Sequence, residues 1–199
     1  MDNDFTVDIK GFTLEYFASE HIYLVDGLIL PSVTKLLSRR FSGKYDGIPK
    51  RILKQAAHAG TAVHEAIENY CVNGAESDLP ELRNFKFLKK HHGFKVIGNE
   101  VPVILFNDGE PVAAGRLDLV LEQDGKIGGA DIKRTATLDK MSLAYQLNLY
   151  RTAYAQSYGV EWEFLKGIHL RGETVRKYVD IPIDESLVDE IITAWRDRT

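Results

Sequence analysis

An Asp-Gly pair at residues 124–125, set between the strand-like stretches GRLDLVLEQ and KIGGADIKR, constrains the fold more than any other feature of the sequence. Asp-Gly between two such stretches favours a two-residue turn and an antiparallel hairpin. With that turn, Asp118 lies opposite Asp131, and Arg116 lies opposite Lys133. A bulge at Gly128-Gly129 is the alternative, and it would shift the pairing by one residue.

Two carboxylates therefore meet on one face of this hairpin. Asp131 and Lys133 are two positions apart, so their side chains share a face of the strand, and the residues around them are mostly small or apolar. Facing carboxylates in such a place share a proton or hold a cation, and hard oxygen ligands suit Mg²⁺ or Mn²⁺. The alternative is that Asp118 and Asp131 pair with Arg116 and Lys133 at the rim of the sheet, and the spacing alone favours it.

The N-terminal part of the chain predicts a small extension. The pattern HIYLVDGLIL indicates a hairpin that turns at Asp26-Gly27. A short helix follows, with Ser32 as its N-cap. An Ala-rich helix over about 50–72 then ends at Asn73-Gly74, and residues 75–82 are expected to form a loop.

From residue 95 onward the pattern changes to that of an α/β domain. Three strands are followed by a helix at about 141–158, by two further strands and by a helix that begins at Asp184. Hairpin-linked strands with a helix between sheet sections predict a mixed sheet flanked by helices.

The composition is that of a globular protein, with 199 residues of which 44% are hydrophobic and 27% are charged. No apolar run is long enough to span a membrane, and the acidic N-terminus does not read as a secretory signal, so we expect a cytoplasmic protein without a membrane partner. The single cysteine, Cys71, excludes an internal disulfide and a Cys-ligated iron–sulfur cluster.

Two stretches are basic although the net charge is −4. Residues 35–54 hold seven Lys or Arg and one acid, and residues 83–95 hold five and no acid. Such stretches can hold a nucleic acid by its phosphates, although a solvated charged surface is the common explanation. The candidate DNA contacts are Lys35, Arg39, Arg40, Lys50, Arg51, Lys54, Lys86, Lys89 and Lys90.

Two helices carry polar pairs spaced by one turn. His64 and Glu68 lie on the Ala-rich helix, and Gln146 and Tyr150 lie on the helix at about 141–158. A lone histidine on a helix is more often structural than a ligand, and a solvated Gln beside a core Tyr is equally ordinary. A Gln within an apolar stripe nevertheless needs hydrogen-bond partners.

Taken together, these residues resemble the PD-(D/E)XK nuclease superfamily, and within it the RecB-like branch that includes Cas4-type and phage exonucleases. The matching pieces stand in the family's order over about 60–155, half of the chain: GTAVHEAIE, EVPV, GRLDLV, ADIKRT and YQLNLY. HIYLVDGLILPSVTKLL is also similar to the opening of phage-borne members. The order of the pieces is more specific than any one of them.

The resemblance implies a ligand set. Asp118 and Asp131 would bind Mg²⁺, for which Mn²⁺ would substitute, and the Ile132 carbonyl would be a further ligand. His64 would be the additional ligand of the RecB-like branch. Asp131 departs from the Glu that many members carry, and a shorter side chain would change the metal geometry.

The resemblance also implies catalytic roles. Lys133 would orient or activate the attacking water, and Gln146 and Tyr150 would position that lysine or the DNA strand. The residues that would support the ligands are Glu100, Glu68 and Arg116. The Cys set of Cas4-type members and a P-loop are absent from the sequence, so neither an iron–sulfur cluster nor a built-in helicase motor is expected.

These roles describe a metal-dependent DNA exonuclease of phage type that acts in recombination, repair or DNA processing in the host cytoplasm. The expected fold is a restriction-endonuclease-like αβββαβ core over residues 49–199, joined to an N-terminal hairpin and basic helical extension over residues 1–48 as a single domain overall. A structure-specific endonuclease and a non-catalytic DNA-binding module are the alternatives. Beyond DNA, a single-strand annealing protein, a helicase and a second copy of the chain are candidate partners.

Overall fold

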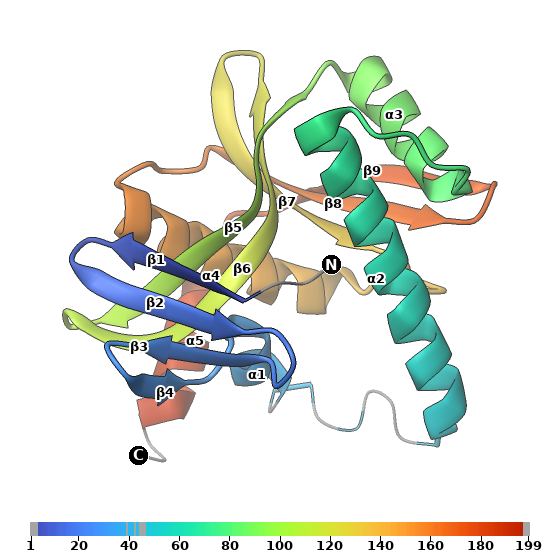
Figure 1. The fold of residues 1–199 in the computed structure, drawn as a ribbon. Coiled ribbons are helices and arrows are strands. Elements are labelled where there is room, and N and C mark those ends of the chain that lie inside the picture. Colours follow the sequence, from blue (N-terminus) through green and yellow to red (C-terminus); the bar gives the residue numbers. More distant parts are fainter. Residues whose placement is uncertain (1–3, 39, 42, 44–46, 197–199) are drawn as a thin grey trace.

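The N-terminal segment forms a complete antiparallel sheet. The structure, a computed structural model, describes residues 4–38, 40, 41, 43 and 47–196 (Figure 1). The strands pair in chain order: β1 (Phe5–Ile9), β2 (Phe12–Phe17), β3 (Ile22–Val25) and β4 (Leu28–Leu30). The predicted turn at Asp26-Gly27 is confirmed, but a hairpin was too small a prediction, because β1 and β2 add two strands that turn at Lys10-Gly11.

The helices before the second sheet match the sequence pattern in two cases out of three. In α1 (Val33–Ser38), the hydroxyl of Ser32 accepts the N–H of Lys35 at 3.1 Å, as its N-cap role predicts. α2 (Lys50–Asn73) ends at Gly74, whose φ of 68° is left-handed. The loop predicted over 75–82 is wrong at its end, because α3 (Pro80–His92) begins there with proline in its first turn and four basic residues in its last.

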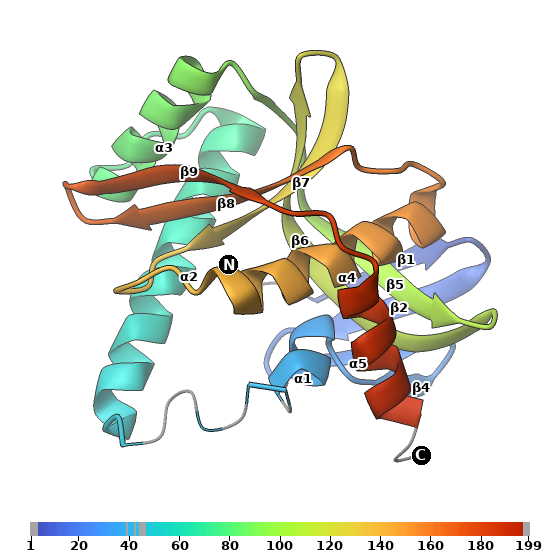
Figure 2. The same cartoon turned by 180° about the vertical axis from the view of Figure 1, so that it is seen from behind.

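The second sheet is mixed, as predicted. It runs β5 (Lys95–Asn107), β6 (Glu110–Gln123), β7 (Lys126–Lys133), β8 (Phe164–Arg171) and β9 (Val175–Ile181), and only the β7–β8 pair is parallel. α4 (Lys140–Tyr158) is the crossover between these parallel strands, and α5 (Ser186–Arg196) begins two residues later than predicted. Helices α1, α4 and α5 pack on one face, and α2 and α3 pack on the other (Figures 1 and 2).

The predicted register of the β6–β7 hairpin is confirmed where the strands pair. The pairs run without a shift from Gln123–Lys126 to Leu119–Ala130, so no bulge interrupts them at Gly128-Gly129. The pairing stops one residue before Asp118 would face Asp131. At that point a carboxylate oxygen of Asp118 accepts the backbone N–H of Ile132 at 2.7 Å instead.

The N-terminal sheet packs on the β5–β6 end of the second sheet. Its buried residues share a cluster with Ile104 and Ala114, and the N–H of Ala114 donates to the carbonyl of Pro31 at 3.1 Å. The boundary expected near residue 48 falls between α1 and α2. None of the helices in the described residues is long and apolar enough to cross a membrane.

Gly129 is required by the packing of a tryptophan on the sheet. A Cβ at this position would lie 1.9 Å from the buried indole of Trp162. We expect Gly129→Ala to lower the free energy of unfolding by about 3 kcal/mol, because backbone or indole must shift. Gly60→Ala on α2, where a Cβ meets nothing within 4 Å, should raise it by about 1 kcal/mol. Urea unfolding of the two variants measures this, and equal stabilities would contradict the packing.

The buried carboxylate of Glu81, at the start of α3, binds residues that follow β7 and β8. It is 2% exposed, and its Oε1 accepts the N–H of Gly172 and the guanidinium of Arg134, each at 2.8 Å. Burial alone would raise the pKa of Glu81. The hydrogen bond from Gly172 and the charge of Arg134 outweigh it, and the pKa lies below its ordinary value.

This lowered pKa predicts an acid-dependent contribution to stability. The ionised form is favoured in the folded state, so its contribution is present above the unfolded pKa near 4.5 and is lost as the pH falls through the lower folded pKa. We expect Glu81→Gln to lower the free energy of unfolding by about 2 kcal/mol at pH 7, and by less at pH 3.5. Unfolding in urea at both values tests this, with the exposed Glu110→Gln as the control. A gap that is equal at both pH values would contradict it.

Candidate metal centre

Three residues from three elements bring potential ligand atoms together. His64 comes from the middle of α2, Glu100 from β5 and Asp118 from β6, and one ligand atom from each lies within 4.8 Å of the other two. The Nδ1 atom of His64 is 3.6 Å from a carboxylate oxygen of Asp118 and 3.7 Å from one of Glu100. We call these three residues the acidic cluster.

Glu100 reaches the cluster through an unusual backbone conformation. Its φ is 47° inside β5, and the β5–β6 pairing skips Glu100 and Asp118 between the pairs Asn99–Leu119 and Val101–Leu117. A non-glycine residue in this region costs about 1–3 kcal/mol, and such strain gathers at functional sites. Glu100 was expected only to support the ligands, but its carboxylate stands among them.

The backbone signal for Glu100 was weak in the sequence. Gly98 lies within the strand pattern two residues earlier, and a glycine inside a strand often marks an irregularity. The register between β5 and β6 does shift between Val96 and Gly98. Sequence reasoning could have located the irregularity there, but not the direction in which it turns the next side chains.

The acidic cluster attracts positive charge. Burial would lower the pKa of His64, but the negative charge of Asp118, with Glu100 and Asp131, outweighs burial and raises that pKa to about 9. His64 is therefore an imidazolium among carboxylates at neutral pH. Its Nε2 lies 3.1 Å from the carbonyl oxygen of Ile132, so the predicted ligands His64, Asp118 and Ile132 do meet.

Asp131 lies beside the cluster and is held by Lys133 and Gln146. The ammonium of Lys133 donates to Oδ1 of Asp131 at 2.9 Å and to the amide oxygen of Gln146 at 3.0 Å. The amide of Gln146 donates in turn to the same Oδ1 at 2.7 Å. Asp131, Lys133 and Gln146 thus form a closed set of contacts, which we call the lysine network. The predicted sharing of a face by Asp131 and Lys133 is confirmed.

One oxygen of Asp131 lacks a hydrogen bond. Lys133 Nζ lies 2.7 Å from Oδ2 in an ion pair, and this buried oxygen has no further hydrogen-bond partner among the described residues. Burial raises the pKa of Asp131, an effect that Lys133 opposes and the charge of Asp118 reinforces. Burial likewise raises the pKa of Asp118, against the effect of His64.

Arg116 links the cluster to the N-terminal sheet. Its Nε lies 2.7 Å from a carboxylate oxygen of Glu100, and its guanidinium carbon lies 5.4 Å from the ring centre of Tyr16 in β2. The alternative placed Arg116 on Asp118, and the ion pair described here joins it to Glu100. Arg116 instead fixes Glu100, as a supporting residue would.

Tyr150 lies near the acidic cluster, whereas Glu68 has no contact with it among the described residues. Tyr150 is buried, burial raises its pKa, and its ring and hydroxyl occupy the space that a side chain at Gly115 would need. No hydrogen bond or ion pair joins Glu68 to the cluster within the part of the chain that the structure describes. Tyr150 therefore packs against β6 at Gly115. For Glu68, the structure shows no contact that would support the expected role.

The predicted DNA contacts separate into three groups. Lys35 is exposed on α1, Arg40 pairs with Glu190 at 2.8 Å, and Arg39 lies outside the described residues. The second group is exposed at the start of α2, and the third lies on α3. The members of these two groups are Lys50, Arg51 and Lys54, and Lys86, Lys89 and Lys90.

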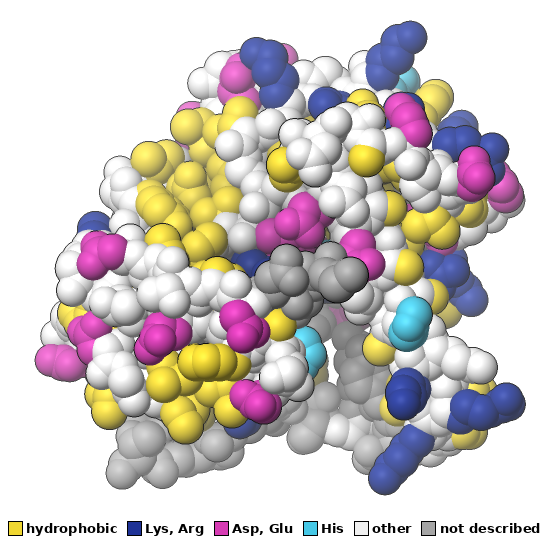
Figure 3. Space-filling view, in the orientation of Figure 1, with side chains coloured by type: hydrophobic (Ala, Val, Ile, Leu, Met, Phe, Trp, Pro, Cys, Tyr) yellow, Lys and Arg dark blue, Asp and Glu magenta, His cyan; other side chains and the backbone are white. Residues whose placement is uncertain are grey.

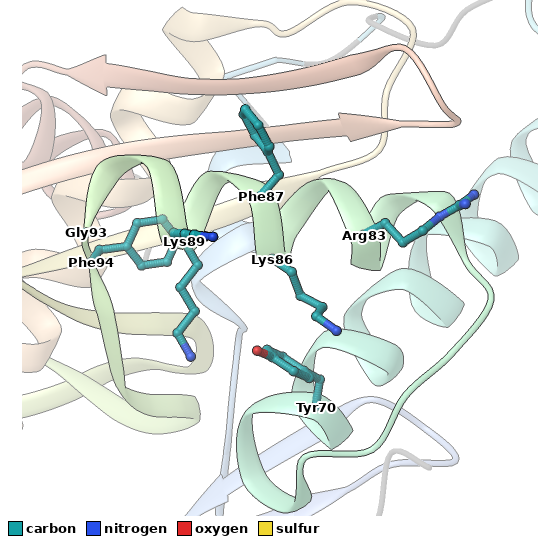
Figure 4. Close-up of a pocket in the computed structure, with 8 residues that line it drawn as sticks. Tyr70, Arg83, Lys86, Phe87, Lys89, Gly93 and Phe94 are labelled. Atoms are coloured by element: carbon teal, nitrogen blue, oxygen red, sulfur yellow. The ribbon is translucent and has the colours of Figure 1, made fainter.

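The α3 group borders a shallow depression of about 650 Å³ between α2 and α3. Figure 4 shows Lys86 and Tyr70 facing each other there. The ammonium groups of Lys86 and Lys89 lie 5.2 and 5.3 Å from the ring centre of Tyr70, and Lys86 also pairs with Glu76 at 2.6 Å. No residue of the acidic cluster lines this depression.

The donor set fits a divalent cation. Carboxylate oxygens and a backbone carbonyl are the ligands of Mg²⁺ and Mn²⁺, and the imidazole of His64 is compatible with Mn²⁺. A cation would compensate the repulsion among the carboxylates.

Comparisons with known proteins do not assign the chain to a family. No family model matches it, and no curated protein matches it. Among solved structures, the crystal structure of SSO0001 is 19% identical, with 82% of this chain and 75% of that chain covered and a TM-score of 0.43. A likeness at this TM-score supports no conclusion about function, so a functional proposal depends on the residues of this chain.

Proposed function

We propose that this protein is a metal-dependent DNA exonuclease built on a restriction-endonuclease-like core. The observation that carries the proposal is the acidic cluster of His64, Glu100 and Asp118 beside the ion-paired Lys133. The element order supports it as well, because two helices (α2 and α3), three strands, a crossover helix and a parallel strand follow one another from α2 to β8. The sequence resemblance rests on the same residues.

The chain supplies two requirements of phosphodiester hydrolysis. The acidic cluster, with the Ile132 carbonyl and Asp131, would hold Mg²⁺ or Mn²⁺. When bound, such an ion lowers the pKa of a coordinated water and neutralises charge on a phosphate. Lys133 is a positive charge fixed by Asp131 and Gln146, and it would stabilise the charge that develops on the phosphate oxygens.

The first test separates the candidate activities. Linear and covalently closed circular duplex DNA are incubated with Mg²⁺, with Mn²⁺ and with EDTA. Loss of the linear form alone supports the exonuclease. Cleavage of the circle supports an endonuclease on the same core, and binding without cleavage of duplex or single-stranded DNA supports a non-catalytic module.

Lys133→Ala should lower the rate of metal-dependent cleavage by at least about 100-fold, because it removes a charge aimed at the transition state. Asp118→Asn should lower it as far, and should also weaken the rise in melting temperature that added Mn²⁺ produces. Lys126→Ala is the matched control, since Lys126 lies exposed at the other end of β7. Cleavage by Lys133→Ala at the normal rate would remove the proposed role of that lysine.

The ion pair between Arg116 and Glu100 predicts a separate effect on metal affinity. Residues that orient a ligand without touching the ion typically change affinity by about 10–100-fold. We expect Arg116→Met to weaken Mn²⁺ binding by about 10–100-fold in calorimetry. Arg116→Lys should restore part of the affinity, because lysine keeps the positive charge beside Glu100 but lacks the two-pronged guanidinium. Unchanged affinity in Arg116→Met would show that Glu100 is not held for metal binding.

A further inference from the structure

The first part of α2 is a helix without a packing partner among the described residues. Every residue from Lys50 to His58 is exposed except Leu53, which is half-buried, and the first buried residue of the helix is Val63. Figure 1 shows this part of α2 extending away from the second sheet. We call residues 50–58 the α2 arm. A helix owes most of its stability to the packing of an apolar face, so the arm has little intrinsic reason to persist.

The charge on the α2 arm does not serve the fold. Lys50, Arg51 and Lys54 have no hydrogen bond or ion pair with any other described residue, and α2 has no acid before Glu65. Cations near a helix N-terminus are also unfavourable, because the helix dipole is positive there. The arm therefore concentrates positive charge that the folded chain does not compensate, and this charge suits a polyanion.

Other charged surfaces contrast with the arm. On α3, Lys86 pairs with Glu76, and Arg83 pairs with Glu173 at 2.7 Å, so much of that charge is already neutralised. The strands and turns of residues 4–30 hold five acids and one lysine. Figure 3 shows Lys and Arg side chains on the projecting helix and Asp and Glu on the lobe opposite. A polyanion is accordingly favoured on the α2 side.

The helix geometry relates the arm to the acidic cluster. At 100° per residue, the positions of Lys50 and Lys54 lie within about 40° and 80° of that of His64 around the helix axis. At 1.5 Å per residue, they lie about 21 and 15 Å from it along the axis. Successive phosphates on one DNA strand rise about 3.4 Å, so these distances correspond to about four to six phosphates.

We propose that the α2 arm binds the DNA backbone about four to six nucleotides from the bond that is cut, on one side of the acidic cluster. The position of the cut relative to the arm rests on the proposed function, whereas the binding of DNA by the arm does not. Phosphate contacts of this kind hold any sequence. The arm therefore sets the grip and the direction of the DNA strand, whereas the acidic cluster and the lysine network act on the bond.

The test compares two variants with the same change of charge. The arm variant is Lys50→Gln and Lys54→Gln, and the control is Arg83→Gln and Lys86→Gln on α3, two cations that each pair with a glutamate. Dissociation constants for a 30-base-pair duplex are measured in EDTA over a range of salt. Two lost phosphate contacts should reduce the slope of log K against log salt by about 1.8 for the arm variant, with little change for the control. Circular dichroism confirms that each variant is folded.

A cleavage assay tests the predicted distance of four to six nucleotides between the arm and the cut. With Mg²⁺, wild type should outperform the arm variant on long substrates and equal it on substrates with fewer than about four nucleotides beyond the cut. An unchanged salt slope in the arm variant, an equal loss in both variants, or a deficit of the arm variant at every length would overturn the proposal. Failure of the proposed function is a different result, namely normal arm-dependent binding with no metal-dependent cleavage by wild type.

Discussion

The structure of the site depends on where the pairing of β6 with its two neighbours is interrupted. Asp118 is paired with neither Glu100 nor Asp131, and its carboxylate accepts the N–H of Ile132. Because the ladder opens at this one level, carboxylates that would otherwise be neighbours in a sheet can point into a common space. His64 on α2 and Arg116 beside Glu100 then compensate part of the negative charge.

The crossover between the parallel strands completes this arrangement. A parallel pair such as β7–β8 needs a long connection, and a helix usually provides it. Here that helix is α4, and its second turn carries Gln146 onto Asp131 and Lys133. The topology of the sheet thus supplies a hydrogen-bond partner for the lysine that local sequence spacing placed beside Asp131.

The sequence predicted those parts of the molecule that local chemistry determines. The Asp-Gly turns at 26–27 and 124–125, the cap at Ser32 and the glycine end of α2 all follow from backbone preferences of neighbouring residues. β1, β2 and α3 were missed, although the turn at Lys10-Gly11 and the proline at the start of α3 carried signals of the same kind. The register of β6–β7 was predictable because a two-residue turn fixes it.

Long-range features could not be predicted in the same way. Whether a basic side chain is paired depends on acids far along the chain, as with Arg83 and Glu173, so two basic stretches of similar composition became different surfaces. The place of Glu100 depends on one backbone angle, and the resemblance assigned it only a supporting role. His64, Asp118 and Ile132 met as expected, whereas Asp131 turned toward the lysine network.

At Glu100, a strained backbone accompanies a carboxylate of the acidic cluster. Glycine adopts a φ of 47° without strain, but glycine has no carboxylate to offer the acidic cluster. A chain optimised only for folding would favour the smaller residue there, and would lose a carboxylate of the acidic cluster in doing so. The fold therefore carries a local strain that gives no benefit to the sheet itself, and the positive guanidinium of Arg116 lies where it can hold the strained residue in place.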